Sequence, residues 1–572
     1  MIILLQKRWV FRNQDYKKDE IIKTAQSLSV SPVILTLLYN RGITSPQDMR
    51  AFIAKSMQNI HNPLELPDME AASSRIYSAI QNGEKICIYG DYDVDGITSV
   101  TILYKYLLSH GADVSYYIPN RFSEGYGLNI MAVNKISKTG CRLLITVDCG
   151  ITSVGEVQLA RAQGMDVIVT DHHNCRERLP EAVAVVDAKR EDSVYPFREL
   201  CGAGVALKTV LAVSQLFGES AKDVFYKYCP YAAIGTIADI VTLTDENRTI
   251  ADRGIKAIRE NAPCGIAALI KAAGISDLNS GSVAFGIAPR LNAAGRMESA
   301  QIGVELLMCS DKKRAEELAN LLNEKNTLRK YEENKIYESA VSKTEADSEY
   351  KNKKIIVICG DGWHEGVIGI AASIICEKYH KPVIMLSSDG KRAKGSARSV
   401  DGFNIYDAIS SCGDLLDAYG GHSMAAGVTV KPDNLEAFDY RINSYADENI
   451  TDEARLPSLK IDCRILPSAL TAANIKMLSS LEPFGCGNEE PVFSIHGATV
   501  KTAMQLGDTK AHLRLQLEKQ GKALSCIAFR MGELYEELTP GRVIDIAFSP
   551  EINVYNGFES VQLRILDIKL VN

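Results

Sequence analysis

The stretch Ile86-Cys87-Ile88-Tyr89-Gly90-Asp91-Tyr92-Asp93-Val94-Asp95-Gly96 decides the fold, because a strand-type apolar run leads directly into three carboxylates at alternate positions. Two further apolar runs also end in polar residues: Leu143–Asp148, and Val167–Thr170, which precedes the triplet Asp171-His172-His173. The carboxyl ends of parallel strands share one edge of a sheet, so we expect these acids and histidines to meet there. If the first strand continues into the motif, its alternation would point the three carboxylates to one side.

Composition limits the classes of protein that this sequence can belong to. A length of 572 residues predicts roughly three to five domains, and 46% hydrophobic residues allow a substantial core. The net charge of −7 gives no support for nucleic-acid binding, so such binding must come from local basic patches. Fourteen cysteines without a C-x-x-C pair argue against structural zinc and a disulfide framework, and they suit a reducing cytoplasm. We expect no transmembrane helix and no signal peptide.

The rhythm of apolar runs predicts an α/β protein of several parts. Short β-rich runs alternate with amphipathic stretches between about 80 and 245, which is typical of a doubly wound parallel sheet. Residues 311–345 contain few helix breakers and predict a long polar helix, and short alternating runs after about 457 predict a small antiparallel barrel. We expect a helical lead-in at 1–70, a parallel-sheet domain at 71–310, a helix and linker at 311–350, a second α/β domain at 351–450 and the barrel at 451–572.

The acids and histidines at the sheet edge predict a metal site. Carboxylates and imidazoles without thiolates suit Mg²⁺ or Mn²⁺, and two histidines favour Mn²⁺. Asp239 joins the set because an acid inside an apolar run is costly unless it is compensated. Two ions sharing a carboxylate would explain so many acids, and such a pair clamps the attacking and leaving oxygens of a phosphoryl displacement. Taken singly, each motif has an ordinary structural explanation: a surface turn, a helix cap, or a buried ion pair at Asp239.

Two segments carry groups that suit an anionic substrate. Ser387–Ser399 places four cations among glycines and serines, where backbone N–H groups and arginine could hold a phosphate. Asn120–Gly127 offers Arg121, with Phe122 and Tyr126 as faces for bases, although packing is the commoner role of such aromatics. The structural alternative for the first segment is a solvated basic loop.

Other candidates remain undecided from the residues themselves. His422 follows two glycines and either donates to a phosphate or serves the turn. The barrel aromatics are either stacking residues or core: Phe529, Phe548, Tyr555 and Phe558.

The order of the motifs DYDVDG, VDCG, DHH and ADIV resembles the DHH phosphoesterase superfamily, and nearly the whole chain is similar to its RecJ branch. Pro289–Met297 is similar to a helix-and-loop segment of that branch, and Gly420–Gly427 to the GGH signature of the DHH-associated domain. The resemblance implies an α/β protein with a DHH-type parallel-sheet domain, a long connecting helix, a DHH-associated domain and a C-terminal OB-fold barrel.

The resemblance also implies the site residues. Two Mn²⁺ or Mg²⁺ ions would be held by Asp91, Asp93, Asp95, Asp148, His172 and Asp239. His173 would lie beside them near the scissile phosphate, and Asp148 is our choice for the bridging carboxylate. Substrate contacts would come from Arg121, Arg290, Arg296, Ser396, Arg398 and His422, with Arg121, Ser396 and Arg398 near the 5′-phosphate of DNA.

By the same resemblance, the chain is expected to be a metal-dependent exonuclease that degrades single-stranded DNA 5′→3′ to 5′-mononucleotides in DNA recombination and repair. Implied partners are a single-strand-binding protein and a RecQ-type helicase, and we expect a cytoplasmic monomer without a membrane. Two alternatives stay open. A small-molecule phosphoesterase for oligonucleotides, cyclic dinucleotides or pyrophosphate would not need the barrel, and an inactive single-strand-binding protein would not need every metal-binding acid. We also expect a chain ending near Asn449 to keep a folded core with a functional metal site.

Overall fold

The computed structural model describes residues 7–12, 18–346, 350, 352–451 and 453–571. The chain divides into two compact units. The first consists of Met1–Val10 with Lys325–Lys460, and the second of Phe11–Glu324 with Ile461–Asn572. The metal motifs and the C-terminal barrel therefore belong to the same unit.

The second unit contains a five-stranded parallel sheet in the order β3-β2-β4-β5-β6, which confirms the predicted α/β class. Its strands are β2 (Ile86–Gly90), β3 (Val114–Tyr117), β4 (Leu143–Val147), β5 (Asp166–Thr170) and β6 (Ala184–Val186). The order reverses between β2 and β4, because β3 lies on one side of β2 and β4 on the other. In doubly wound sheets such a reversal opens a ligand crevice at the carboxyl ends of the strands.

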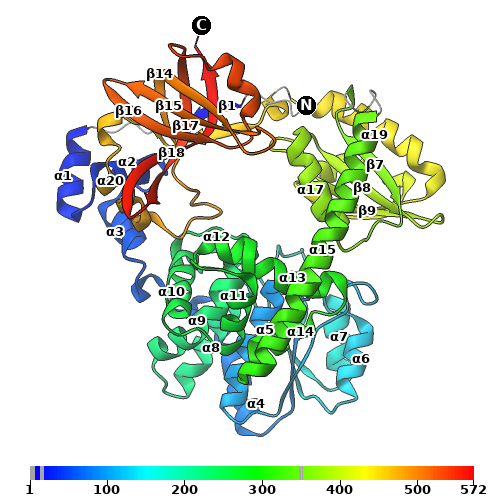
Figure 1. Ribbon diagram of the computed structural model, residues 1–572. Coiled ribbons are helices and arrows are strands. Elements are labelled where there is room, and N and C mark those ends of the chain that lie inside the picture. The colour runs from blue at the N-terminus through cyan, green and yellow to red at the C-terminus, as the bar shows by residue number, and fades with distance from the viewer. Residues whose placement is uncertain (1–6, 13–17, 347–349, 351, 452, 572) are drawn as a thin grey trace. The chain divides into compact units, whose positions relative to one another are not determined.

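Helices cover both faces of this sheet, which is why its strands are almost entirely apolar. Ile86 and Ile88 of β2 belong to one core with α4 (Met69–Gln81), α5 (Val94–Ser109) and α8 (Gly202–Leu216). Cys87 and Tyr89 belong to the other core, with α6 (Ile130–Ser137) and α7 (Val154–Ala162). Successive side chains of β2 thus point alternately into two separate hydrophobic cores. Figure 1 labels helices of this part of the chain, among them α4, α5, α6 and α7.

Further helices follow the sheet and complete this part of the second unit. They are α9 (Ala221–Ala238), α10 (Asp245–Asn261), α11 (Cys264–Ala273), α12 (Ser280–Ser282), the π-helical turn Val283–Ile287, α13 (Ala288–Met297) and α14 (Gln301–Met308). The predicted long polar helix is α15 (Lys312–Ala346). The start of the chain carries β1 (Arg8–Phe11), α1 (Lys18–Leu28), α2 (Pro32–Asn40) and α3 (Pro46–Ala54), and Ser31 caps α2 in front of the proline.

The C-terminal part of the second unit is the predicted barrel, but its pairing is mixed and not purely antiparallel, because β16 pairs with β18 in parallel. Its sheet has the order β13-β14-β15-β16-β18-β17, and the pairing of β14 with β17 closes it. The bounds are β13 (Cys463–Arg464), β14 (Phe493–Leu506), β15 (His512–Lys519), β16 (Lys522–Ala528), β17 (Val543–Tyr555) and β18 (Phe558–Leu570). Closure leaves no long unpaired edge along the body of the barrel.

Residues 478–490, which we call the strap, join the barrel to the helices of the second unit. The strap carbonyls of Ser480 and Glu482 accept hydrogen bonds from Lys55 Nζ at 3.2 and 2.7 Å and from Arg248 Nη2 at 3.3 and 2.8 Å. The Arg248 side chain is buried. A chain ending near Asn449 would lose these acceptors, so the structure argues against our expectation that such a piece keeps an intact core.

The first unit contains a mixed five-stranded sheet in the order β10-β11-β9-β8-β7, with only β7 and β8 parallel. Its strands are β7 (Ile356–Asp361), β8 (Val383–Ser388), β9 (Ala393–Arg398), β10 (Leu416–His422) and β11 (Ala425–Val430). Its helices are α17 (Ile368–Tyr379), which packs on β8 and β9, α18 (Ile405–Ser410) and α19 (Leu435–Asn449). The short strand β12 (Ser458–Ile461) pairs with β1.

Within the described residues, no single helix is long and apolar enough to cross a membrane. The bent pair Glu20–Leu28 and Pro32–Asn40 is long and apolar enough only when the two helices are counted together.

Candidate functional site

The first acidic motif lies in a tight turn between β2 and α5. The strand ends at Gly90, so its alternation does not continue through the three carboxylates. Asp93 instead caps α5, because its Oδ1 accepts hydrogen bonds from the backbone N–H of Asp95 at 2.9 Å and of Gly96 at 3.2 Å. A Cβ at Gly96 would lie 2.3 Å from the carbonyl oxygen of Asp91. Glycine there lets the turn fold back, and the turn brings the carboxylates together.

Three further groups reach this turn from other strands and helices. Asp148 follows β4 with a left-handed φ of 58°, His172 follows β5, and Asp239 ends α9. His172 Nε2 lies 3.0 Å from Asp148 Oδ1, 3.7 Å from Asp95 Oδ2 and 3.7 Å from Asp239 Oδ2. One imidazole nitrogen therefore faces three carboxylates that are far apart in the sequence.

Three groups of side chains could each hold a metal ion. Within each group, the potential ligand atoms lie within 4.8 Å of one another. The groups are Asp91 with Asp93 and Asp148, Asp95 with His172 and Asp239, and Asp148 with His172 and His173. The sets share members, so the geometry suits two neighbouring cations better than one. All six predicted ligands and His173 are brought together here.

Burial and mutual repulsion disfavour the charged form of the carboxylates at this site when no cation is bound. Burial, with the negative charges of Asp95 and Asp93 added, raises the pKa of Asp239 to about 8. Burial and the neighbouring aspartates also raise the pKa values of Asp91 and Asp148 well above the usual range. Asp91 Oδ1 is buried and has no hydrogen-bond partner among the described residues. Divalent cations would relieve both the repulsion and the missing contact, so the residues fit Mn²⁺ or Mg²⁺.

Asp95 also has a structural role that no sequence pattern indicates. Its Oδ2 accepts from the backbone N–H of Gly202 at 2.6 Å and its Oδ1 from that of Ala203 at 2.8 Å. These N–H groups begin α8, where an unpaired donor and the helix dipole favour a negative charge. The two partners lie more than 100 residues beyond Asp95 in the sequence, so only the tertiary structure shows the contact.

Asp171 accepts hydrogen bonds from neighbouring protein groups and belongs to none of the three candidate metal groups. Its Oδ2 accepts from the backbone N–H of Ile151 at 2.9 Å, and its Oδ1 accepts from that of His172 at 2.7 Å and from His173 Nδ1 at 2.7 Å. Although burial raises it, the pKa of Asp171 is lowered by the hydrogen bond and the charge of His173. The first residue of the triplet therefore orients the second and third.

The three arginines predicted in the second unit have different surroundings. The Arg121 guanidinium lies 5.1 Å from the ring centroid of Tyr92, next to the first motif. Arg296 lies in the last turn of α13, and a Cβ at the preceding Gly295 would lie 2.7 Å from the carbonyl oxygen of Tyr92. That end of α13 therefore touches the metal turn. Arg290 donates instead to Asn323 Oδ1 at 3.0 Å and to the carbonyl oxygen of Gly286 at 2.7 Å.

Ser396 and Arg398 lie on a central strand of the first unit, and not in an open loop. β9 pairs with β8 on one side and β11 on the other, so its backbone N–H groups belong to ladders. At Ser396 and Arg398 an anion would therefore have to be held by the side chains, whereas the turn between β8 and β9 lies outside these ladders. Arg398 Nη1 donates to Ser396 Oγ at 2.7 Å. The pairing of Arg398 with Ala425, and of Ala425 with His422, places the exposed His422 in the same cross-strand row.

Burial separates the undecided aromatics of the barrel. Phe548 is fully buried and packs against Phe493 in the barrel core, so it cannot stack on bases. Phe529, Tyr555 and Phe558 are exposed at 49%, 73% and 80%. The hairpin tip between β17 and β18 carries the last two.

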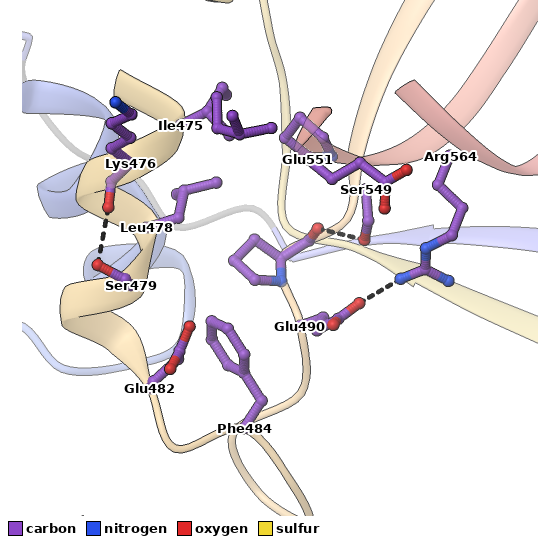
Figure 2. A pocket seen from close by; sticks show the side chains of 13 residues that line it. Ile475, Lys476, Leu478, Ser479, Glu482, Phe484, Glu490, Ser549, Glu551 and Arg564 are labelled. Carbon is purple, nitrogen blue, oxygen red and sulfur yellow. Dashed lines mark hydrogen bonds and ion pairs between the residues drawn. The ribbon is translucent and has the colours of Figure 1, made fainter. Parts of the chain in front are cut away.

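A cavity of about 430 Å³ lies between the barrel and the strap, away from the acids and histidines (Figure 2). It is lined by strap residues such as Phe484 and Glu490 and by Ser549, Glu551 and Arg564 of the β17–β18 hairpin. Figure 2 shows Arg564 extending to Glu490 across one side. Its mixed charges and absence of clustered histidines distinguish it from the metal edge.

Three family models match most of the chain. The DHH family N-terminal domain matches residues 85–236, the DHHA1 domain matches 352–448, and the RecJ OB domain matches 461–567. The matched segments contain the first three acidic motifs, the β9–β11 region and the closed barrel, in that order.

Curated relatives and solved structures extend the likeness over the full length. The single-stranded-DNA-specific exonuclease RecJ of Bacillus subtilis is 38% identical over 564 residues, which cover 98% of this chain and 70% of that protein. The RecJ protein of Escherichia coli is 31% identical, covering 96% of this chain and 98% of its own length. The crystal structure of RecJ in complex with Mn²⁺ from Thermus thermophilus matches with a TM-score of 0.86 at 29% identity, covering 99% of this chain and 80% of that one.

Proposed function

This chain belongs to the RecJ family of single-stranded-DNA-specific exonucleases, and we propose that it hydrolyses single-stranded DNA from the 5′ end to 5′-mononucleotides. The observation that carries the proposal is the meeting of six predicted metal ligands at the switch point of the sheet, within a chain that also carries a RecJ OB domain. The first feature supports phosphoryl transfer, and the second supports a polymeric single strand as substrate.

The metal ligands would be Asp91, Asp93, Asp95, Asp148, His172 and Asp239, with Mn²⁺ or Mg²⁺ as the ions. The match to RecJ structures in complex with Mn²⁺ and with Mg²⁺ supports this choice. When bound, the ions would neutralise the charge that develops on a phosphodiester during displacement. The protein's own contribution is to hold the carboxylates in a fixed, largely buried arrangement, which the turn at Gly96 and the capping of α8 by Asp95 supply.

Substrate recognition would be divided between the metal edge and the other segments. Arg121 and Arg296 lie beside the turn that carries the acids, where a backbone phosphate would have to approach. Ser396, Arg398 and His422 would receive the terminal 5′-phosphate, since guanidinium and hydroxyl donors suit a doubly charged group. Arg290 would also contact the substrate, because it lies on α13 together with Arg296. In the structure its guanidinium donates to Asn323 and to the Gly286 carbonyl. The barrel would hold the strand farther from its end.

The biological setting of the proposal rests on the family. We extend it to DNA recombination and repair in the cytoplasm, with a single-strand-binding protein and a RecQ-type helicase as partners and a monomer as the working unit. The alternatives are not favoured. A small-molecule phosphoesterase would not need the barrel, which matches the RecJ OB domain at residues 461–567. An inactive binding protein would not need the acids that meet in the candidate metal groups.

A direct assay tests the proposal. The purified chain is incubated with Mn²⁺ or Mg²⁺ and single-stranded DNA labelled at either end, with duplex DNA and with dinucleotides, each with and without EDTA. We expect mononucleotides to appear first from the 5′ label of the single strand, and EDTA to stop their release. Release first from the 3′ label would refute the polarity, and hydrolysis of dinucleotides without degradation of long strands would favour the small-molecule alternative.

A further inference from the structure

The side chain of Tyr126 completes a chain of hydrogen bonds that ends on the Asp-His-His triplet. His173 Nδ1 donates to Asp171 Oδ1 over 2.7 Å. The Tyr126 hydroxyl lies 3.1 Å from Nε2 and 3.3 Å from Nδ1 of the same ring. Since Nδ1 is already used by Asp171, Nε2 is the nitrogen that the hydroxyl can serve. A hydroxyl both donates and accepts, so this contact persists in either charge state of the imidazole.

The acceptor at one end of this chain is fixed. Asp171 is buried, and three backbone N–H groups hold its carboxylate: those of Ile151 at 2.9 Å, His172 at 2.7 Å and His173 at 3.2 Å. The carboxylate therefore cannot turn with the imidazole. A ring anchored at Nδ1 only can still tilt about that contact, whereas a second anchor defines its plane.

The tyrosine at the other end is also placed by the fold. Its ring meets the His173 ring edge-on at a centroid distance of 5.8 Å and the Tyr92 ring at 6.5 Å. Gly125 and Gly127 flank it, both with a left-handed φ of 80°, so the chain turns sharply on each side. The Tyr89 hydroxyl donates to the Gly127 carbonyl at 2.7 Å and ties this turn to the core. Tyr126 is nevertheless 56% exposed, which leaves room for a substrate beside it.

We propose that Tyr126 is a positioning residue that fixes the plane of the His173 imidazole beside the candidate metal ligands. The proposal rests on the proposed nuclease function and deepens it. It assigns to the Asn120–Gly127 segment a role in orienting the triplet, separate from any stacking of bases on its aromatic rings.

The test removes one oxygen atom. Tyr126→Phe keeps the ring and both edge contacts and deletes only the hydroxyl. We expect kcat on single-stranded DNA to fall about three- to tenfold, with KM unchanged within about twofold, as for the loss of one hydrogen bond that acts in the transition state. Tyr117→Phe is the matched control, because the Tyr117 hydroxyl donates to Glu124 Oε1 at 2.5 Å in the same segment and has no contact with His173.

A second readout does not depend on turnover. In the metal-free protein with isotope-labelled histidine, the ring signals of His173 are assigned by their loss in His173→Gln. We expect Tyr126→Phe to shift these signals and Tyr117→Phe to leave them in place. An unmoved His173 signal, or an equal loss of kcat in the Tyr117 control, would overturn the proposal. If the wild-type protein does not degrade single strands, the proposed function fails, and the His173 signals still decide whether Tyr126 positions the ring.

Discussion

Replacing Arg398 with alanine should separate the two kinds of DNA 5′ end. Arg398 Nη1 donates to Ser396 Oγ and to the Ala397 carbonyl, both at 2.7 Å, and its Nε donates to Ser373 Oγ at 3.1 Å. These oxygen acceptors fix the guanidinium beside the first turn of α17, where a Cβ at Gly369 would lie 3.0 Å from Nη2. A terminal phosphate monoester carries more charge than an internal diester, so it gains more from this fork of donors.

The size of the effect follows from the contact that is lost. One hydrogen bond between charged groups contributes about 1.5–3 kcal/mol, which corresponds to roughly ten- to a hundredfold in an equilibrium or in kcat/KM. We expect Arg398→Ala to lower kcat/KM by this factor on 5′-phosphorylated single strands, mainly through KM. On 5′-hydroxyl strands the loss should be about two- to threefold, which is the lower end for an uncharged contact, about 0.5 kcal/mol.

The assay compares kcat/KM on the two substrates for the wild type, Arg398→Ala and the control Arg392→Ala. Arg392 lies in the same hairpin, but its side chain is 60% exposed and lies 3.7 Å from Asp389, so it should affect both ends alike and weakly. Equal losses on both substrates in Arg398→Ala would refute the reasoning, because Arg398 would then merely follow the DNA backbone.

Three further predictions follow from other parts of the structure. Asp148→Ala should abolish nuclease activity while the affinity for single-stranded DNA is kept, because two of the candidate ion groups share Asp148; near-normal turnover would contradict its assignment. Burial raises the pKa of Asp187 to about 7 from 3.8, so its contribution to stability is present below about pH 4 and is lost as pH rises to about 7. Asp187→Asn should therefore raise the free energy of unfolding by up to about 4 kcal/mol at pH 8 and change it little at pH 4, and denaturant unfolding at the two pH values that gave equal gains would exclude this cause. Arg248→Ala should lower the free energy of unfolding by about 1–3 kcal/mol, because the strap carbonyls of Ser480 and Glu482 lose one of their two donors and keep Lys55; a loss below about 0.5 kcal/mol in denaturant titration would show that the strap does not depend on Arg248.

Local pattern and topology determined much of the metal site from the sequence itself. An apolar run that ends in acids gives a strand with ligands at its carboxyl end, and parallel strands bring those ends to one edge. Asp91, Asp148 and His172 could be predicted to meet for this reason. The apolar pattern did not predict that the strand ends at Gly90. It ends there because Asp93 caps the start of α5, and a capped helix start excludes a continued strand.

The tertiary structure alone decided the contacts between segments that are remote in the sequence. The capping of α8 by Asp95, the hold of Arg248 on the strap and the contact of Tyr126 with His173 each join positions with no shared periodicity. The same applies to β9, where Ser396 and Arg398 read as a basic loop but lie between two partner strands. Sequence patterns record the period of a helix or strand, whereas these contacts depend on which elements pack together, and that is settled by burial over the whole chain.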